Sequence, residues 1–245
     1  MSAGPKSFLI AWAMLFLSQP TLAQESPQTG QSMIDAQLAY WDEESLKTLG
    51  HLAECVAERH PQAADTFVQD VSDSTLLERD QARLVDEGCI KQYWFRSSRT
   101  KVEPDIYRRL LGEALLTLAY ADAPLPAVDE VTQSVDNPHL PAVPLDEVHP
   151  YYRSIFIIDR HYGELNAYSE CVARAQPQEV FALMSTDLDS SEETSALAAL
   201  DAAATECIAL RPNVTFPSFL RRGDLLQQLY LLTRLAGAPV PQREN

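Results

Sequence analysis

The sequence predicts an all-α protein made of two homologous helical units, with about four helices and one disulfide in each. The stretch Glu54–Gln62 recurs as Glu170–Gln178, with Glu, Cys, Val, Ala, Pro and Gln in register. A second cysteine follows each copy at nearly the same distance, Cys89 in one half and Cys207 in the other. Apolar residues recur at helical spacing, and no long stretch alternates apolar and polar residues as a half-buried strand would.

Residues 1–23 are typical of a secretory signal peptide. Lys6 precedes an apolar run, and the run is followed by a small-residue cleavage site that ends at Ala23. The run is shorter than the roughly 20 residues that a membrane-spanning helix needs, although an uncleaved amino-terminal anchor is the alternative. We therefore expect a periplasmic or secreted protein. Residues 24–32 are polar and without apolar periodicity, which favours a mobile lead.

The first unit is expected over residues 33–120. Apolar periodicity predicts a helix over residues 33–60, with a break near residues 42–45, that turns Cys55 inward. Pro61 suits the first turn of a second helix.

Two further helices complete this unit. Thr75 with Glu78 forms a capping box for a third helix, and Gly88 is expected to end it just before Cys89. Pro104 begins a fourth helix, in which apolar residues cover more than half of the circumference. A face this wide predicts the central and most buried helix of the unit.

The second half of the chain repeats this plan after a connector over residues 121–150, which is rich in proline and acidic residues and has no Lys or Arg. The second unit is expected over residues 151–241, with a tail over residues 242–245. Its helices are predicted at residues 152–175, 177–184 and 218–236, with another after a capping box of Ser190 and Glu193. The β-prone run Ile155–Ile158 is the one stretch that favours a strand.

Four cysteines in an exported chain predict two disulfides. Equivalent units should close equivalent loops, which selects Cys55 with Cys89 and Cys171 with Cys207. In the chain-entropy model, each closure contributes roughly 4 kcal/mol to stability.

The duplicated charges predict one buried ion pair in each unit. Glu54 and Glu170 are repeat partners on apolar helices, where a lone charge would be costly. We expect Glu54 to pair with Arg108 or its neighbour Arg109, and Glu170 to pair with Arg222 or its neighbour Arg221. The alternative interpretation is a carboxylate held for catalysis.

This combination resembles uncharacterised exported proteins of Gram-negative bacteria. The shared features are Glu-Cys-Val, a Pro-started helix, a Ser-capped helix that ends in Cys, and Arg-Arg before a Leu-rich helix. The resemblance covers each unit but not the connector. It implies an exported helical protein, and it carries no known activity or catalytic residues.

Charge and motif content narrow the classes of function. A formal net charge of −16 disfavours nucleic acid and anionic membrane surfaces as partners. His51 with Glu54, and His161 with Glu164, place only two metal ligands one helical turn apart, so we expect no metal site. The chain also lacks phosphate-loop, Gly-x-Ser-x-Gly and His-Glu-x-x-His motifs, and no cofactor is expected.

The stretch Lys91–Lys101 is the strongest candidate for recognition, because it gathers aromatic and basic residues in an acidic protein and the second unit lacks them. Such residues dominate binding hot spots; they are Tyr93, Trp94, Phe95, Arg96, Arg99 and Lys101. The alternative is that Trp94 closes the core of the first unit.

These observations favour a non-enzymatic binding or interaction protein of the cell envelope, with a protein or small-molecule partner that the sequence does not identify. A groove between the units would be the natural place for binding. One alternative is an exported hydrolase or metal-dependent enzyme with a site between the units. Another is a protein that only stabilises an envelope assembly.

Overall fold

The computed structural model describes residues 27–39, 41–70, 84–92, 104–136, 144 and 146–242. These residues form helices and connecting loops without a strand, so the all-α prediction is confirmed. Both predicted disulfides are present, Cys55 with Cys89 and Cys171 with Cys207. Within the described ranges, none of the helices combines the length and apolar character of a membrane span. The predicted signal peptide lies outside the described residues.

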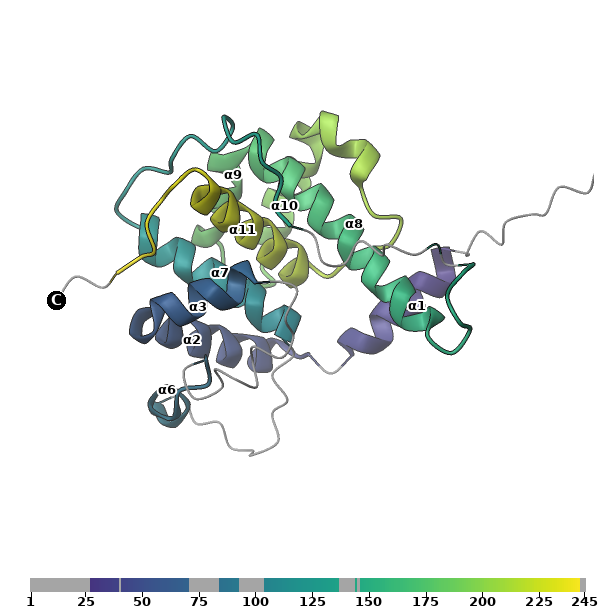
Figure 1. The fold of residues 1–245 in the computed structure, drawn as a ribbon, viewed down its shortest axis with the longest axis horizontal. Helices are drawn as coiled ribbons and strands as arrows, with labels where there is room; N and C mark the ends of the chain where they lie inside the picture. The colour runs from purple at the N-terminus through teal and green to yellow at the C-terminus, as the bar shows by residue number, and fades with distance from the viewer. Residues whose placement is uncertain are drawn as a thin grey trace, which may run out of the picture.

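The described helices are arranged along the chain as follows (Figure 1). The first half contains α1 (Pro27–Leu38), α2 (Glu43–Arg59), α3 (Pro61–Gln69), α6 (Glu87–Gln92) and α7 (Pro104–Tyr120). The second half contains α8 (Arg153–Ala175), α9 (Pro177–Ala182), the 3₁₀ helix η1 (Leu183–Ser185), α10 (Ser191–Ala203), the 3₁₀ helix η2 (Thr205–Leu210) and α11 (Ser218–Leu235).

Local sequence chemistry sets most helix boundaries. Asp42 has an extended backbone, and its side chain accepts a hydrogen bond from the Ser45 amide at 2.7 Å, which produces the predicted break before α2. At the start of α10, the hydroxyl of Ser190 accepts from the Glu193 amide at 3.1 Å, and Glu193 accepts from the Asp189 amide at 2.9 Å. The capping box at Ser190 is therefore present, with Asp189 as the backbone donor to Glu193. The capping box predicted at Thr75 lies outside the described residues.

Two local predictions were wrong. Instead of a mobile lead over residues 24–32, the chain from Pro27 onward belongs to α1. The side chain of Gln31 fixes this helix, because it accepts from the Thr215 amide at 2.6 Å and donates to the Thr215 carbonyl at 2.9 Å. Gly88 also lies inside α6 and does not end a helix before Cys89. In contrast, the β-prone run Ile155–Ile158 is helical within α8, as the helix predicted over residues 152–175 requires.

Helices α7 and α11 occupy the centre of the molecule, with α2 and α3 against α7 and with α8 along α11 (Figure 1). A Cβ atom on Gly112 would lie 3.0 Å from the Cα of Gln227, and one on Gly223 would lie 3.0 Å from the Cβ of Arg109. Both glycines thus permit a close helix–helix approach. Arg109 faces Gly223, and Gly112 faces Gln227, so these backbone-level contacts advance in the same direction along both helices and the two helices run parallel. Buried residues from both predicted units form one hydrophobic core cluster.

Two ion pairs join α7 and α11 reciprocally. The Nε of Arg109 lies 3.0 Å from Asp224 Oδ1, and these side chains are only 4% and 1% exposed. The Nη2 of Arg222 lies 2.6 Å from Glu113 Oε1. In the orientation that satisfies both of its amide atoms, Asn166 of α8 donates to Asp224 at 2.7 Å. The second arginine of each Arg-Arg pair therefore reaches the other half of the chain.

We predict that Asp224→Asn lowers the free energy of unfolding by about 3 kcal/mol or more, because it leaves the Arg109 guanidinium buried without its counter-charge. The double variant Arg109→Met/Asp224→Asn should lose less than the sum of the two single variants. Urea denaturation of the four proteins measures this coupling.

The exposed pair between Lys47 and Glu43 provides the control, since both side chains are more than half exposed. A double-mutant cycle on Lys47 and Glu43 should show little coupling free energy. Additive losses at Arg109 and Asp224 would contradict the prediction.

Candidate functional site

The predicted ion pairs of Glu54 and Glu170 were wrong. The side chain of Glu54 is 61% exposed and its carboxylate lies 3.2 Å from His51 Nδ1. Because water solvates this carboxylate, it needs no buried cation. Glu170 does form an ion pair, but with Arg174 one turn along α8, at 2.7 Å.

The predicted arginine partners have other contacts. Arg108 lies over the Phe67 ring, 4.6 Å from its centroid, and donates to the Asp70 carbonyl at 3.1 Å. Arg222 contacts Glu113 across the central helix pair, and it also contacts Glu193 at 3.3 Å. Arg108 thus contributes to packing, and Arg222 joins the two halves.

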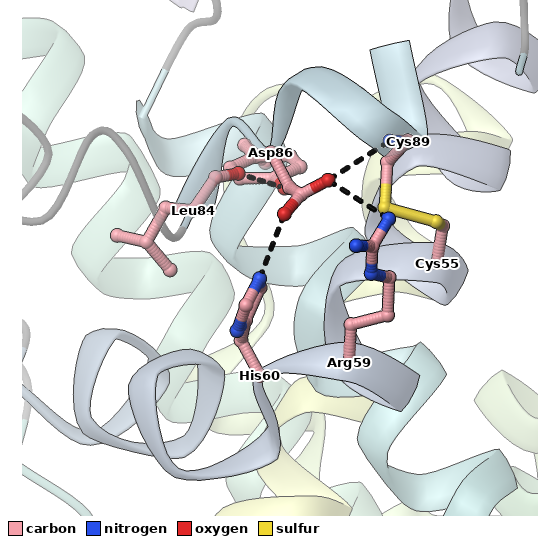
Figure 2. Close-up of a disulfide and its surroundings, with 7 residues drawn as sticks. Cys55, Arg59, His60, Leu84, Asp86 and Cys89 are labelled. Atoms are coloured by element: carbon pink, nitrogen blue, oxygen red, sulfur yellow. Dashed lines mark hydrogen bonds and ion pairs between the residues drawn. A yellow bond between two sulfur atoms is a disulfide. The ribbon is translucent and has the colours of Figure 1, made fainter. Parts of the chain in front are cut away.

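The first disulfide lies beside a polar cluster centred on Asp86 (Figure 2). One carboxylate oxygen of Asp86 lies 2.9 Å from His60 Nε2, and the other lies 3.0 Å from Arg59 Nη1. The same carboxylate accepts from the Cys89 amide at 3.0 Å at the start of α6. The hydrogen bond with His60 is the main cause that lowers the pKa of Asp86 below the usual aspartate value. This cluster ties α2 and α6 together next to their disulfide.

The second disulfide has different surroundings. In the register that aligns the two cysteine pairs, Ala175, Gln176 and Ala204 occupy the places of Arg59, His60 and Asp86. The second half therefore lacks the polar cluster at these positions. A groove of about 440 Å³ lies here, which we call the connector groove. Its lining comes from the connector (Asp129, Ser134), α8 (Ala167, Glu170, Cys171, Arg174, Ala175) and η2 (Glu206, Leu210).

Arg174 fixes the connector wall of this groove. Its guanidinium donates to Glu170 Oε1 at 2.7 Å and to the backbone carbonyls of Val131 and Gln133. Glu170 in turn accepts from the Val135 amide at 3.1 Å. Glu170 was expected to pair with Arg222 or Arg221. Its carboxylate instead holds the connector against α8.

Small side chains keep the groove open. In the register that aligns Cys55 with Cys171, Ala167 stands where the first half has His51, and Ala175 stands where it has Arg59. A long side chain at either place would extend into the space between α8 and the connector. Among the described residues, the two halves therefore differ in side-chain size at these two positions.

A second cleft, of about 730 Å³, lies where the ends of the two halves meet. It is lined by Leu118–Ala123, which span the carboxyl end of α7, and by Pro239–Gln242 after α11. Parallel packing of α7 and α11 accounts for this, because it brings the carboxyl ends of both helices to one side of the molecule.

The two His and Glu pairs that the sequence places one helical turn apart are in contact. His51 Nδ1 meets Glu54, and His161 Nδ1 lies 3.2 Å from Glu164, whose pKa is lowered chiefly by this hydrogen bond. In the part of the chain that the structure describes, no group of three His, Cys, Asp or Glu side chains could hold a metal ion.

The recognition stretch Lys91–Lys101 lies almost entirely outside the described residues. Lys91 is exposed and pairs with Glu87 at 3.3 Å. Nothing is described for the side chains of Tyr93, Trp94, Phe95, Arg96, Arg99 and Lys101, so their role remains a prediction.

Sequence reasoning did not identify Asp86, His60 and Arg174 as residues that hold separate segments of the fold together. Asp86 had a local signal, since an aspartate three residues before Cys89 can cap a short helix. The partners of Arg174 are carbonyls more than forty residues earlier in the chain. No local pattern indicates such a contact.

Comparisons of this chain with protein-family models, with curated proteins and with solved structures find no match.

We predict that Asp86→Ala lowers stability by about 1 kcal/mol through loss of the cap on α6. Asp86→Asn keeps a side-chain acceptor and removes the charge. Because the folded-state pKa of Asp86 is lowered, its ionised form stabilises the protein above the unfolded aspartate pKa of about 3.9, and the contribution is lost as the pH falls through the folded-state pKa. Urea denaturation of wild type and Asp86→Asn should therefore show a difference near neutral pH that shrinks in acid. A difference independent of pH would contradict this assignment.

We also predict that Glu170→Gln increases hydrogen exchange at the Val135 amide and along residues 129–135, because it weakens the contacts that hold the connector. Glu164→Gln is a matched control on the same helix, since Glu164 pairs with Arg160 and His161. Unchanged exchange of the connector in Glu170→Gln would show that these contacts do not hold it.

Proposed function

We propose that this chain is an exported, non-enzymatic binding protein of the cell envelope that engages its partner through the connector groove. The export part of the proposal is supported by the signal-like amino terminus and by two disulfides, which form and persist in oxidising compartments.

The pre-organised groove is the observation that carries the binding part of the proposal. One wall contains Cys171, which is cross-linked to Cys207, and the other wall is the connector, which Arg174 and Glu170 hold in place. A surface whose shape is already fixed loses little conformational entropy when a partner binds. Its volume of about 440 Å³ lies within the usual range of binding pockets.

Sequence differences between the two halves of the chain also support the connector groove as the binding site. The central arginines and the cysteine pairs occur in both halves, since both need them for folding. Ala167 and Ala175 replace His51 and Arg59 in the second half, and this exchange opens the groove without altering the cysteines or the central arginines. Such positions are free to serve recognition.

The test is site-specific photo-crosslinking in envelope extracts of the source organism. A photoreactive phenylalanine analogue replaces Leu210, an exposed residue that lines the groove. We expect a discrete crosslinked product that disappears when Ala175→Arg is added, because that change restores the long side chain of the first half. The same analogue at exposed Tyr151, which lies before the amino end of α8, is the control.

Folding of Ala175→Arg is checked by its thermal unfolding, because the substitution must block the groove without unfolding the chain. A product that persists unchanged in a folded Ala175→Arg protein would reject the groove as the binding site. Export is tested separately by fusing the first 32 residues to a reporter that is active only in oxidising compartments.

A further inference from the structure

The connector groove carries negative charge that its own residues do not neutralise. Arg174 is the basic residue of its lining, and its guanidinium is already bound to Glu170 and to two backbone carbonyls. Asp129 and Glu206 also line the groove, both are exposed, and neither pairs with another of the described residues. Two carboxylates therefore remain available at the groove.

An exposed apolar side chain also lines the same groove. Leu210 lines it and is 45% exposed, and Ile208 on the same short helix is 57% exposed. Few large apolar side chains are as exposed in the described part of this acidic protein. The groove thus offers apolar contact and unpaired negative charge side by side.

We infer that the connector groove binds a basic segment of a partner protein, in which a Lys or Arg side chain meets Asp129 and Glu206 and a neighbouring apolar side chain packs on Leu210. This inference rests on the proposed function and specifies the chemistry of the partner. Charge complementarity favours a cation, since carboxylates without a counter-charge attract basic groups and repel acidic ones.

The apolar contact distinguishes a protein segment from other cationic partners. A polyamine matches the carboxylates but has no bulky apolar group to pack on Leu210. A protein segment supplies both kinds of group within a few residues. Arg is the best-suited side chain, because its planar guanidinium can bind carboxylates in a bidentate manner.

Fluorescence titration of the purified protein with the blocked peptide acetyl-Leu-Ala-Arg-Ala-Leu-amide, carrying a dye, provides the test. We expect saturable binding, which Asp129→Asn/Glu206→Gln weakens by roughly fivefold, the size expected for two exposed charge contacts. Ala175→Arg should abolish it. Peptides with Glu or Gln in place of Arg should bind weakly.

The matched control is Asp146→Asn/Glu147→Gln, which removes the same two charges at exposed positions before the amino end of α8. The lining of the groove on α8 begins at Ala167, roughly 20 Å along the helix from that end, given the rise of an α-helix. If this control weakens binding as much as the groove variant does, the peptide responds only to the net charge and the inference fails.

Two further outcomes would also overturn the inference. Equal binding of the Gln peptide would show an apolar site without charge recognition, and spermidine that binds as tightly as the peptide and displaces it would show a polyamine site. Failure of this inference is distinguishable from failure of the proposed function. A groove-dependent photo-crosslink combined with no preference for the Arg peptide would keep the groove as a binding site and reject only the basic partner.

Discussion

The reciprocal ion pairs between α7 and α11 constrain the rest of the structure. Arg109 with Asp224, and Arg222 with Glu113, place charged groups where little water reaches them. Removing a charge from water is costly, so each arginine requires its acid at hydrogen-bonding distance. This requirement aligns the two helices along their axes. The close approach at Gly112 and Gly223 then determines how near they lie, and a larger residue at either position would force a neighbour to move.

The central helix pair explains why the disulfides lie apart from it. Each disulfide joins a long helix to a short one, α2 to α6 in one half and α8 to η2 in the other. Because the core depends on α7 and α11, the surroundings of the disulfides can differ between halves. A polar cluster around Asp86 lies beside the first disulfide, and the connector groove lies beside the second.

Local sequence reasoning succeeded where the interaction is local, and it failed where the partner is distant. The cap at Asp42, the capping box at Ser190 and the helix after Pro61 each depend on a few neighbouring residues. Glu54 and Glu170 looked equivalent because their neighbours in the sequence are similar. Their environments differ, since Glu54 faces water and Glu170 faces a connector that comes from another part of the chain.

The sequence by itself determined the helical class, the helices that begin at Pro61, Pro104 and Pro177, and both disulfide pairings. Periodicity, helix-starting prolines and equivalent cysteine spacing are short-range or repeated signals. Only the tertiary structure decided which arginine meets which acid and that the connector lies against α8. It also decided that Asp129 and Leu210 line one groove. These contacts join residues that are far apart in the chain. Several pairings would satisfy the same charges, and the packing of α7 against α11 selects among them.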